Sequence, residues 1–471
     1  MENSVTTAPA TVASEPVPQE TPVEDKTVAV DTNKEETVTQ EEKVSAETNT
    51  QEWANATTFK GASFLSTVIN TINTVIGAAI ISIAYSIQIS GVWGAIVLVL
   101  VVLIPSLVTS YYMSCATVYT NEDIYGRIGE KLTNKVVGVL ANISLMILDF
   151  GIDVAYMNVL FNQIVAIGRD VFKQGEFFEN NKVIIGLIVT IVILFPLCSI
   201  KTMDSLQFTS GIAVVSIFLF VITCIVLGIK GFATRGWDLN GWPKSLPDLS
   251  TSFAVFVLCF CSHVNTSKLT SELRFKQGKS KFATRVKKSF RATTYAYIVC
   301  ALSYMFVGIC GYAAYGDNIK DSILDNMVGG FFWYIRIAYG LVVMFSYPIL
   351  GYPACLTIDS FIFKGERTAT RRYVEGFIWT ILTFVVCVAI PSVSKIFGIT
   401  GNTCGVLLTF IWPSIYFIAM YREEQKKPVD MKSSWFKPKP WEVIVAWIIL
   451  VLGIIVCIWA TSMEVMKLVN P

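Results

Sequence analysis

The chain has 471 residues, of which 53% are hydrophobic and only 15% are charged, and its mean hydropathy is +0.57. Soluble globular proteins carry about a quarter of their residues as charged side chains, so this composition excludes an ordinary soluble domain and indicates a polytopic membrane protein. The net charge of +2 gives no support for a nucleic-acid partner.

Residues 1–59 differ in composition from the rest of the chain. They are rich in Glu, Thr, Val, Pro and Ala and contain no apolar run, so we expect an acidic, disordered tail. This segment lacks a basic stretch followed by an apolar core. It is therefore not a signal peptide, and the first hydrophobic span must itself direct membrane insertion.

A transmembrane domain is expected over residues 60–462. A membrane helix needs roughly 20 mostly apolar residues, and eleven segments meet this requirement. Spans 1–5 fall within 64–229, spans 6–10 within 251–420, and span 11 at 441–462. Individually, the spans cover about 64–88, 93–117, 138–166, 183–200, 206–229, 251–271, 290–315, 332–358, 374–391, 396–420 and 441–462.

The basic loops set the expected orientation. Lys and Arg gather in the loops after the even-numbered spans, including eight between residues 274 and 291, whereas the loop after span 7 holds three aspartates against one lysine. The positive-inside rule then places the N-terminal tail in the cytoplasm. Because the number of spans is odd, the short C-terminal segment 463–471 lies outside the cell or in a lumen.

Span 1 contains the polar sequence VINTINTVIGAAIISIAYSIQISG, from Val68 to Gly91. Asn70, Asn73 and Gly77 recur at helical spacing, so one face of this helix is polar and small. A contact between helices would explain a single amide. Two amides beside a glycine and two alanines favour the lining of a polar site.

Span 6 changes character abruptly. In FAVFVLCFCSHVNTSKLTSEL, the apolar half ends at Cys261 and a polar half begins with Ser262 and His263. A helix that stopped at Cys261 would be too short to cross a bilayer. Transporters built from inverted repeats place a discontinuous helix at the same position of each half, here spans 1 and 6. Such irregular backbone is tolerated only inside protein or against a watery cavity.

Span 3 carries two acids, Asp149 and Asp153, one helical turn apart. An acid at the bilayer centre costs about 2.5–3.5 kcal/mol on insertion scales, so we expect these side chains to face a cavity or a partner. In a tilted helix, Asp149 would instead approach an interface. The two carboxylates would also repel each other, which favours protonation of one.

Span 8 offers oxygen ligands. Pro348 and Pro353 each remove a backbone N–H and free a carbonyl, and Ser346 adds a hydroxyl. Hard oxygen ligands of this kind suit a small cation such as sodium. An ordinary proline kink is the competing interpretation. Arg336 lies toward the outer end of the same span.

These segments resemble the amino acid/auxin permease family, in particular its sodium-coupled neutral amino acid transporters and vacuolar amino acid transporters. Span 1 matches the family pattern without a gap, and span 6 keeps His263 and Glu272-Leu273 at the family separation. The segment PSVSKIFGITGNTCGVLLTFIWPSIYFI is similar to the tenth helix of the family. The matches of span 1 are Val68, Asn70, Asn73, Gly77, Ile80, Tyr85 and Gly91.

The resemblance implies a LeuT-like, all-α fold in which spans 1–5 and 6–10 form inverted repeats and span 11 is peripheral. It implies an amino acid site at mid-membrane, with the carboxylate on exposed backbone N–H groups of span 1 and the amino group on freed carbonyls of spans 1 and 6. The substrate-binding residues expected are Asn70, Asn73, Thr74, Gly77, Ala78, Ala79, Asp153, Ser262 and His263. A sodium ion would be held by Asn73, the Ile76 and Val342 carbonyls and Ser346.

Several residues depart from the family pattern. Ala78 and Ala79 replace a Ser-Gly pair, and their methyl groups favour a smaller substrate. Lys268 stands where span 6 usually has proline, and Asn265 where neutral transporters often have glutamate. His263 is the single histidine of the chain; with a free pKa near 6.5, it is a candidate for pH-sensitive coupling or for a structural hydrogen bond at the break.

The sequence therefore predicts a secondary active amino acid transporter, driven by sodium or protons through alternating access, with neutral substrates favoured. Cationic substrates paired with Asp149 or Asp153 are an alternative, and an amino acid sensor that signals through the N-terminal tail is another. The chain has no Walker A motif and no nucleophile–base pair or metal cluster, so we expect neither an ATP-driven pump nor an enzyme, and no cofactor beyond a sodium ion. The sequence is compatible with a plasma membrane and with a vacuolar or lysosomal membrane. It contains no feature that indicates the oligomeric state.

Overall fold

The computed structural model describes residues 61–200, 207–237, 239–273, 281–329, 332–363, 367–428 and 438–469. The expected N-terminal tail falls outside these ranges. The described residues are almost entirely helical, and one isolated bridge within them pairs Ala62 with Leu273. The all-α class expected from the sequence is therefore confirmed.

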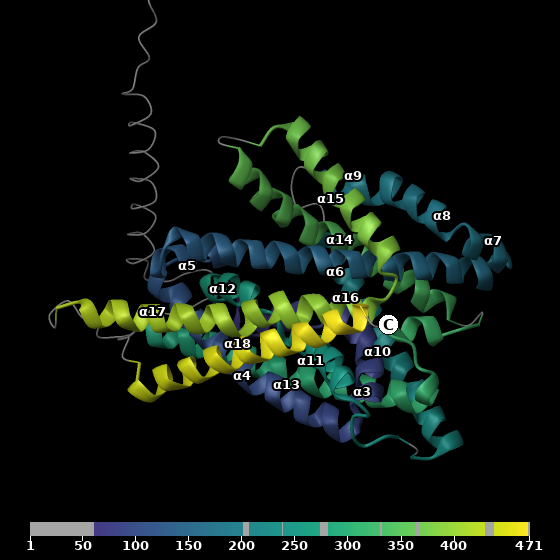
Figure 1. The fold of residues 1–471 in the computed structure, drawn as a ribbon, viewed down its shortest axis with the longest axis horizontal. Coiled ribbons are helices and arrows are strands. Elements are labelled where there is room, and N and C mark those ends of the chain that lie inside the picture. Colours follow the sequence, from purple (N-terminus) through teal and green to yellow (C-terminus); the bar gives the residue numbers. More distant parts are fainter. Residues whose placement is uncertain are drawn as a thin grey trace, which may run out of the picture. The chain divides into compact units, whose positions relative to one another are not determined.

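The first half of the chain contains the elements that correspond to the expected spans 1 to 5 (Figure 1). Span 1 is divided into a helix, a 3-10 turn and a second helix, and span 4 contains a π-helical turn. The elements are α2 (Phe64–Val75), η1 (Ala78–Ser82), α3 (Ile83–Ser90), α4 (Val92–Thr120), α5 (Tyr125–Leu132), α6 (Lys135–Asp170), α7 (Gly175–Asn180), α8 (Lys182–Val189), η2 (Thr190–Leu194), α9 (Phe195–Cys198) and α10 (Gln207–Arg235).

The second half begins with another divided span. In Figure 1, the last two long helices, α17 and α18, run side by side in yellow-green and yellow. The elements are α11 (Leu246–Phe260), α12 (His263–Glu272), α13 (Lys281–Tyr315), η4 (Gly316–Asn318), η5 (Ile323–Asn326), α14 (Trp333–Ile362), α15 (Ala369–Ala389), α16 (Val393–Thr400), η6 (Gly401–Gly405), η7 (Leu407–Ile411), α17 (Trp412–Lys426) and α18 (Pro440–Val469).

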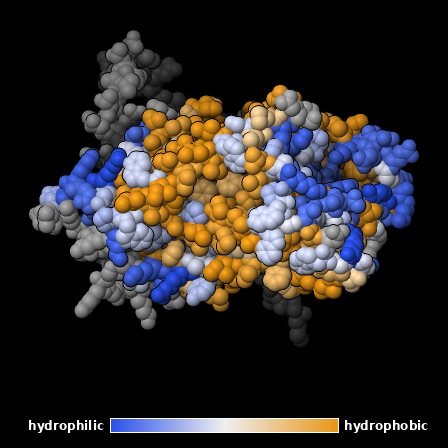
Figure 2. Space-filling model, turned by 60° about the horizontal axis from the view of Figure 1, so that its bottom comes forward, coloured by the Kyte–Doolittle hydropathy of each residue, from blue (hydrophilic) through white to orange (hydrophobic). Residues whose placement is uncertain are grey.

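Within the described ranges, nine helices are long and apolar enough to cross a membrane, or ten if the bent pair α2 and α3 counts as one span. Span 4 corresponds to a shorter apolar helix, Lys182–Cys198. The expected count of eleven is therefore not confirmed, whereas the multi-span architecture is. Figure 2 shows a broad hydrophobic surface with hydrophilic residues gathered at both ends, as a bilayer requires.

Two element boundaries differ from those expected. Helix α5 lies between spans 2 and 3, where the hydropathy pattern predicts no helix. Its buried and exposed residues alternate at helical spacing without a long apolar run, so hydropathy does not detect it. Helix α18 continues to Val469, so most of the segment expected to be a short C-terminal extension is helical.

The two broken spans adopt the same backbone turn. At the break of span 1, Ile76 has φ −75° and ψ 72°, and the Gly77 N–H donates to the Val75 carbonyl at 2.8 Å. At the break of span 6, Cys261 has φ −80° and ψ 65°, and the Ser262 N–H donates to the Phe260 carbonyl at 2.9 Å. Both are inverse γ-turns.

Two tyrosines of α13 hydrogen-bond to these turns. The Tyr304 hydroxyl donates to the Val75 carbonyl at 2.6 Å, and the Tyr297 hydroxyl donates to the Phe260 carbonyl at 3.0 Å. Tyr297 and Tyr304 are seven residues apart and therefore lie on one face of the helix. Both side chains are fully buried. One helix thus supplies a second donor to the γ-turn carbonyl at each break, which lipid could not do.

Replacing Tyr304 with Phe tests this arrangement. The variant removes the hydroxyl donor and leaves the Val75 carbonyl with the γ-turn N–H of Gly77 alone, and a lost hydrogen bond of this kind costs about 0.5–1.5 kcal/mol. Tyr304→Phe should therefore lower the thermal unfolding midpoint of the purified protein in detergent. Tyr295→Phe on the same helix is the matched control, because Tyr295 is 58% exposed. Equal midpoints for the two variants would contradict the role assigned to Tyr304.

Candidate functional site

A cavity of about 260 Å³ lies beside the break of span 1. Five elements contribute to its wall: α2 with the break itself, α6, α10, α12 and α14. Its lining residues are Asn73, Thr74, Ile76, Gly77, Tyr156, Ile217, Asn265, Tyr339, Val342, Val343, Phe345, Ser346, Ile349 and Leu350. This volume is below the roughly 300–1,000 Å³ typical of sites for drug-sized ligands, so the cavity suits a small solute.

The polar groups of this cavity are uncharged. No Asp, Glu, Lys, Arg or His occurs among its lining residues. Within the described ranges, no hydrogen bond joins the side chain of Asn73, Thr74, Asn265 or Ser346 to another residue. The cavity therefore presents hydroxyl and amide groups that are available to a ligand.

Backbone donors lie next to the same cavity. The turn η1 begins at Ala78, and its preceding residue, Gly77, provides no side-chain cap. The first N–H groups of a helical segment have no partner within it, so those of Ala78 and Ala79 are available. The Gly77 N–H is different, because it already donates to the Val75 carbonyl in the γ-turn. Of the three residues expected to offer backbone N–H groups to the substrate carboxylate, Gly77, Ala78 and Ala79, the geometry of the break leaves the last two.

The structure brings some of the expected substrate residues of span 1 to the cavity and leaves others outside it. Asn73, Thr74 and Gly77 line it. Asn70, one turn earlier, is exposed and does not line it. The side chain of Ala79 is 6% exposed and belongs to the apolar core, while that of Ala78 lies outside the described part. Substrate contact by these residues stays a prediction.

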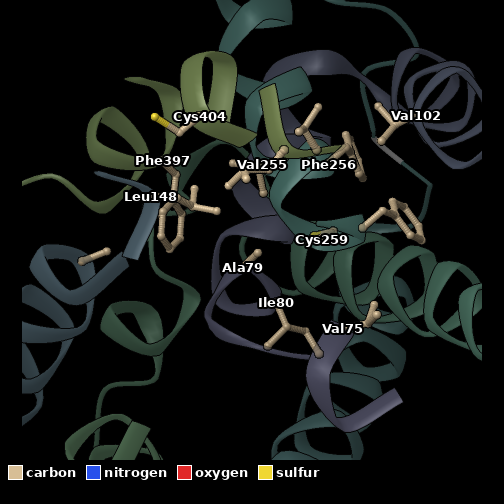
Figure 3. Packing of buried hydrophobic residues seen from close by; sticks show 14 of the residues in the cluster. Val75, Ala79, Ile80, Val102, Leu148, Val255, Phe256, Cys259, Phe397 and Cys404 are labelled. Atoms are coloured by element: carbon tan, nitrogen blue, oxygen red, sulfur yellow. The ribbon is translucent and has the colours of Figure 1, made fainter. Parts of the chain in front are cut away.

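The core forms the opposite side of the break. Figure 3 shows Val75, Ala79 and Ile80 in the same group of buried residues as Phe256 and Cys259 of α11. The broken first span is therefore packed against the broken sixth span on its apolar side. Its polar side faces α6 and α14 across the cavity.

All four residues expected to hold sodium line this cavity, namely Asn73, Ile76, Val342 and Ser346. An amide oxygen, a hydroxyl and backbone carbonyls fit a monovalent cation, because no carboxylate supplies the charge that a divalent ion requires. The described residues contain no cluster of three or more His, Cys, Asp or Glu side chains that could hold a metal ion. Pro348 removes the N–H that the Met344 carbonyl would otherwise accept, so the carbonyl it frees is two residues from Val342.

Asp153 does not line the cavity. Its side chain is fully buried, and Trp379 Nε1 of α15 donates to its Oδ2 at 2.9 Å. A Cβ added at Gly351 of α14 would lie 3.3 Å from the same oxygen, so the carboxyl group fills the space where α6, α14 and α15 meet. Asp149, 6% exposed, is also absent from the cavity wall. The expected contact between Asp153 and substrate therefore has no geometric support in this conformation.

Ser262 and His263 also lie away from the cavity wall. Ser262 Oγ is 2.8 Å from the Tyr297 hydroxyl. The fully buried His263 ring faces α4, with Nε2 3.2 Å from the Ser106 carbonyl and 2.8 Å from Thr109 Oγ1. This geometry matches the structural interpretation of His263, in which its ring fixes the broken span to α4. A role in proton coupling stays a prediction.

The sequence did not assign three polar residues of the cavity. Tyr339 lies seven residues before Ser346 and so shares its face of α14, a spacing that could have identified it. Tyr156 follows Asp153 by three residues on α6 but reaches the cavity, whereas Asp153 does not. Asn265 stood out only as a departure from the family pattern, and the structure places it in the wall.

One turn before Tyr339, a buried arginine joins α14 to neighbouring segments. Arg336, 1% exposed, donates through Nη1 to Gln163 Oε1 at 3.1 Å and through Nη2 to the Met327 carbonyl. Asp325 of η5 in turn accepts from Gln163 Nε2 at 3.3 Å. This network attaches α14 to α6 and to the segment after α13, beyond the cavity.

A family model described as "Transmembrane amino acid transporter protein" matches residues 60–466. The chain belongs to this family. Amino acid transporter AVT6A of Arabidopsis thaliana is 26% identical over 76% of this chain and 81% of its own length. Vacuolar amino acid transporter 5 of Schizosaccharomyces pombe is 24% identical over 77% and 86%. Sodium-coupled neutral amino acid transporter 7 of Danio rerio is 20% identical over 84% and 85%.

Solved structures agree on the fold. The inward-facing conformation of Mhp1 matches with a TM-score of 0.55 at 9% identity, covering 87% of this chain and 91% of that chain. A mutant of the manganese transporter of Eremococcus coleocola matches with a TM-score of 0.55 at 12% identity, covering 86% and 88%. The chain therefore has the LeuT-like fold. Its membership of the amino acid transporter family makes it a transport protein rather than an enzyme.

The pairing of Asp153 with Trp379 generates a stability prediction. Trp379→Phe removes the donor to a buried carboxyl group, and such a loss costs about 1.5–3 kcal/mol, so the thermal unfolding midpoint in detergent should fall. Trp333→Phe, at a position 48% exposed on α14, is the control. Adding Asp153→Leu to Trp379→Phe should restore part of the loss, because both polar partners are then gone. No recovery in the double variant would contradict the pairing.

Proposed function

We propose that this family member is a secondary active transporter of neutral amino acids, coupled to sodium or protons, and that the cavity beside the break of span 1 binds the substrate. The observation that carries the proposal is the lining of that cavity. Its side chains are uncharged, several of its polar groups have no partner in the described ranges, and two backbone N–H groups begin a helical segment at its edge.

The substrate carboxylate would accept from the N–H groups of Ala78 and Ala79. These donors stand at the positive end of the outer half of span 1, which favours an anion. The ammonium group would donate to oxygens of Thr74 and Asn265, which line the same cavity outside the proposed ion site. The two γ-turn carbonyls contribute less than the family resemblance implied, because Tyr304 and Tyr297 already donate to them.

Neutral substrates are favoured over cationic ones by the position of the acids. A lysine or arginine side chain would need a carboxylate in the cavity to offset its desolvation. Asp149 and Asp153 are buried between helices and do not line it. The name of the relative from Danio rerio, sodium-coupled neutral amino acid transporter 7, is consistent with this preference.

The coupling ion is proposed to be sodium at Asn73 and Ser346, which line the same cavity from α2 and α14. Their side chains supply neutral oxygens, which suit a monovalent ion. Opposite conformations of the fold would expose the cavity to each side in turn, as in transporters with inverted repeats. We place this activity in a plasma membrane or in a vacuolar or lysosomal membrane, with the N-terminal tail on the side of the basic loops.

Uptake into proteoliposomes tests the proposal. The full chain should accumulate radiolabelled alanine when an inward sodium gradient is imposed, and a proton gradient applied separately identifies the alternative coupling. Asn73→Ala and Ser346→Ala should each raise the sodium concentration for half-maximal uptake roughly tenfold, the effect of losing a contact to a charged group worth about 1.5 kcal/mol.

Ser303→Ala provides the control for these variants. Ser303 is a half-buried serine of α13 outside the cavity, and its hydroxyl donates to its own helix at the Val299 carbonyl. If both cavity variants keep the sodium response of Ser303→Ala, the ion site is wrong. If no gradient drives accumulation of any amino acid, the transport proposal itself fails.

A further inference from the structure

A second cavity, of about 350 Å³, lies between α5, α17 and α18 and shares no lining residue with the cavity beside span 1. Its position is the end of the bundle at which α17 finishes and α18 begins. We call it the cationic groove. It is lined by Lys131, Leu132, Thr133, Ile415, Ile418, Ala419, Arg422, Glu423, Lys426, Trp447 and Leu450.

The groove changes from apolar to cationic along α17. Ile415, Ile418, Arg422 and Lys426 recur at three- and four-residue spacing, so they lie on one face of the helix. Ile418 is 5% exposed and forms part of the apolar floor, whereas Arg422 and Lys426 are exposed near the end of the helix.

Helix α18 supplies the opposite wall. Leu450, 8% exposed, continues the apolar floor, and Trp447 stands at the rim. The Arg422 guanidinium lies over the Trp447 ring at 5.6 Å from its centroid. Such a contact holds a cation in place without neutralising its charge. Tryptophan is also the residue most typical of the level of lipid headgroups.

Two of the three basic residues of the groove, Arg422 and Lys426, form no ion pair within the described residues. Lys131 pairs with Glu122 at 2.7 Å, and the buried Glu424 pairs with Lys427 at 3.0 Å. Glu423 is the single acid among the lining residues. The groove therefore carries an excess of positive charge directly above an apolar floor.

The helix surface next to the groove is apolar. On both sides of Trp447 in the sequence, α18 exposes large apolar side chains, as a helix that contacts the hydrocarbon of a bilayer does. Figure 2 shows hydrophobic surface of this kind bordered by hydrophilic residues at each end. The exposed residues of α18 include Ile444, Ile448, Val451, Leu452, Ile455 and Ile458.

We propose that the cationic groove binds the headgroup of an anionic phospholipid, whose phosphate contacts Arg422 and Lys426 while its acyl chains lie along α17 and α18. The charge matches an anion, and basic pockets between membrane helices bind anionic headgroups. The apolar floor selects a lipid over a free anion, because a soluble phosphate would bury none of that surface. The site is separate from the substrate cavity and does not depend on the transport proposal.

Native mass spectrometry of the full chain in detergent tests this site. Phosphatidylserine and phosphatidylcholine with identical acyl chains are titrated in parallel, and the wild type should retain one phosphatidylserine in preference. Arg422→Gln with Lys426→Gln should weaken phosphatidylserine binding roughly 25-fold, since each basic residue near an anionic membrane surface contributes about fivefold. Arg422→Lys with Lys426→Arg should keep the binding and confirms that the fold tolerates changes at both positions.

The control is Lys287→Gln, which removes an exposed lysine of α13 outside the groove and should leave binding unchanged. Inorganic phosphate at millimolar concentration should not displace the lipid. Equal binding of the two lipids, equal losses in Lys287→Gln and in the groove variant, or displacement by inorganic phosphate would each overturn the proposal.

Discussion

The hydrogen bonds from α13 to the two chain breaks are the constraint on which the rest of the structure depends. A helix that is interrupted within a membrane exposes carbonyls that lipid cannot satisfy. Tyr304 and Tyr297 donate to one such carbonyl in span 1 and one in span 6. Because both breaks are inverse γ-turns, a single helix with two tyrosines two turns apart serves both. The equal geometry of the breaks also expresses the repeat relationship between the halves of the fold.

This arrangement determines which groups remain available for function. The γ-turn of span 1 uses the Gly77 N–H, and α13 uses the Val75 carbonyl, so both are occupied on the core side. The next N–H groups begin η1 and lie at the edge of the cavity. On the opposite wall, Asp153 of α6 accepts from Trp379 of α15, and Arg336 of α14 donates to Gln163 of α6. The polar cavity thus lies between the break of span 1, which is hydrogen-bonded to α13, and the helices α6 and α14.

The sequence predicted the features that depend on composition and local spacing. The membrane class, the polar face of span 1 and the division of span 6 follow from residue types that lipid excludes. Asn73, Thr74, Gly77, Ile76, Val342 and Ser346 line one cavity, as expected from spans 1 and 8. The count of eleven spans was not confirmed. The segment expected as span 4 forms a shorter apolar helix with a π-helical turn.

Features that depend on distant partners could not be read from the sequence. The acid Asp153 looked like a ligand for substrate, but its donor, Trp379, is 226 positions away in the chain. For His263 the sequence leaves a structural role and a coupling role open, and its partners on α4 are evident only from the fold. The tyrosines of α13 gave a regular spacing but no indication of what they contact. In each case a polar residue in a span was evident, whereas the side of the helix it faced was set by packing.

The most direct test is a cryo-electron microscopy structure of the full chain in lipid nanodiscs at saturating alanine concentration. The account predicts density for one amino acid in the cavity between Asn73 and Ser346, with its carboxylate within hydrogen-bond distance of the N–H groups of Ala78 and Ala79. Ordered substrate beside Asp153 instead, or density elsewhere while this cavity stays empty, would contradict it.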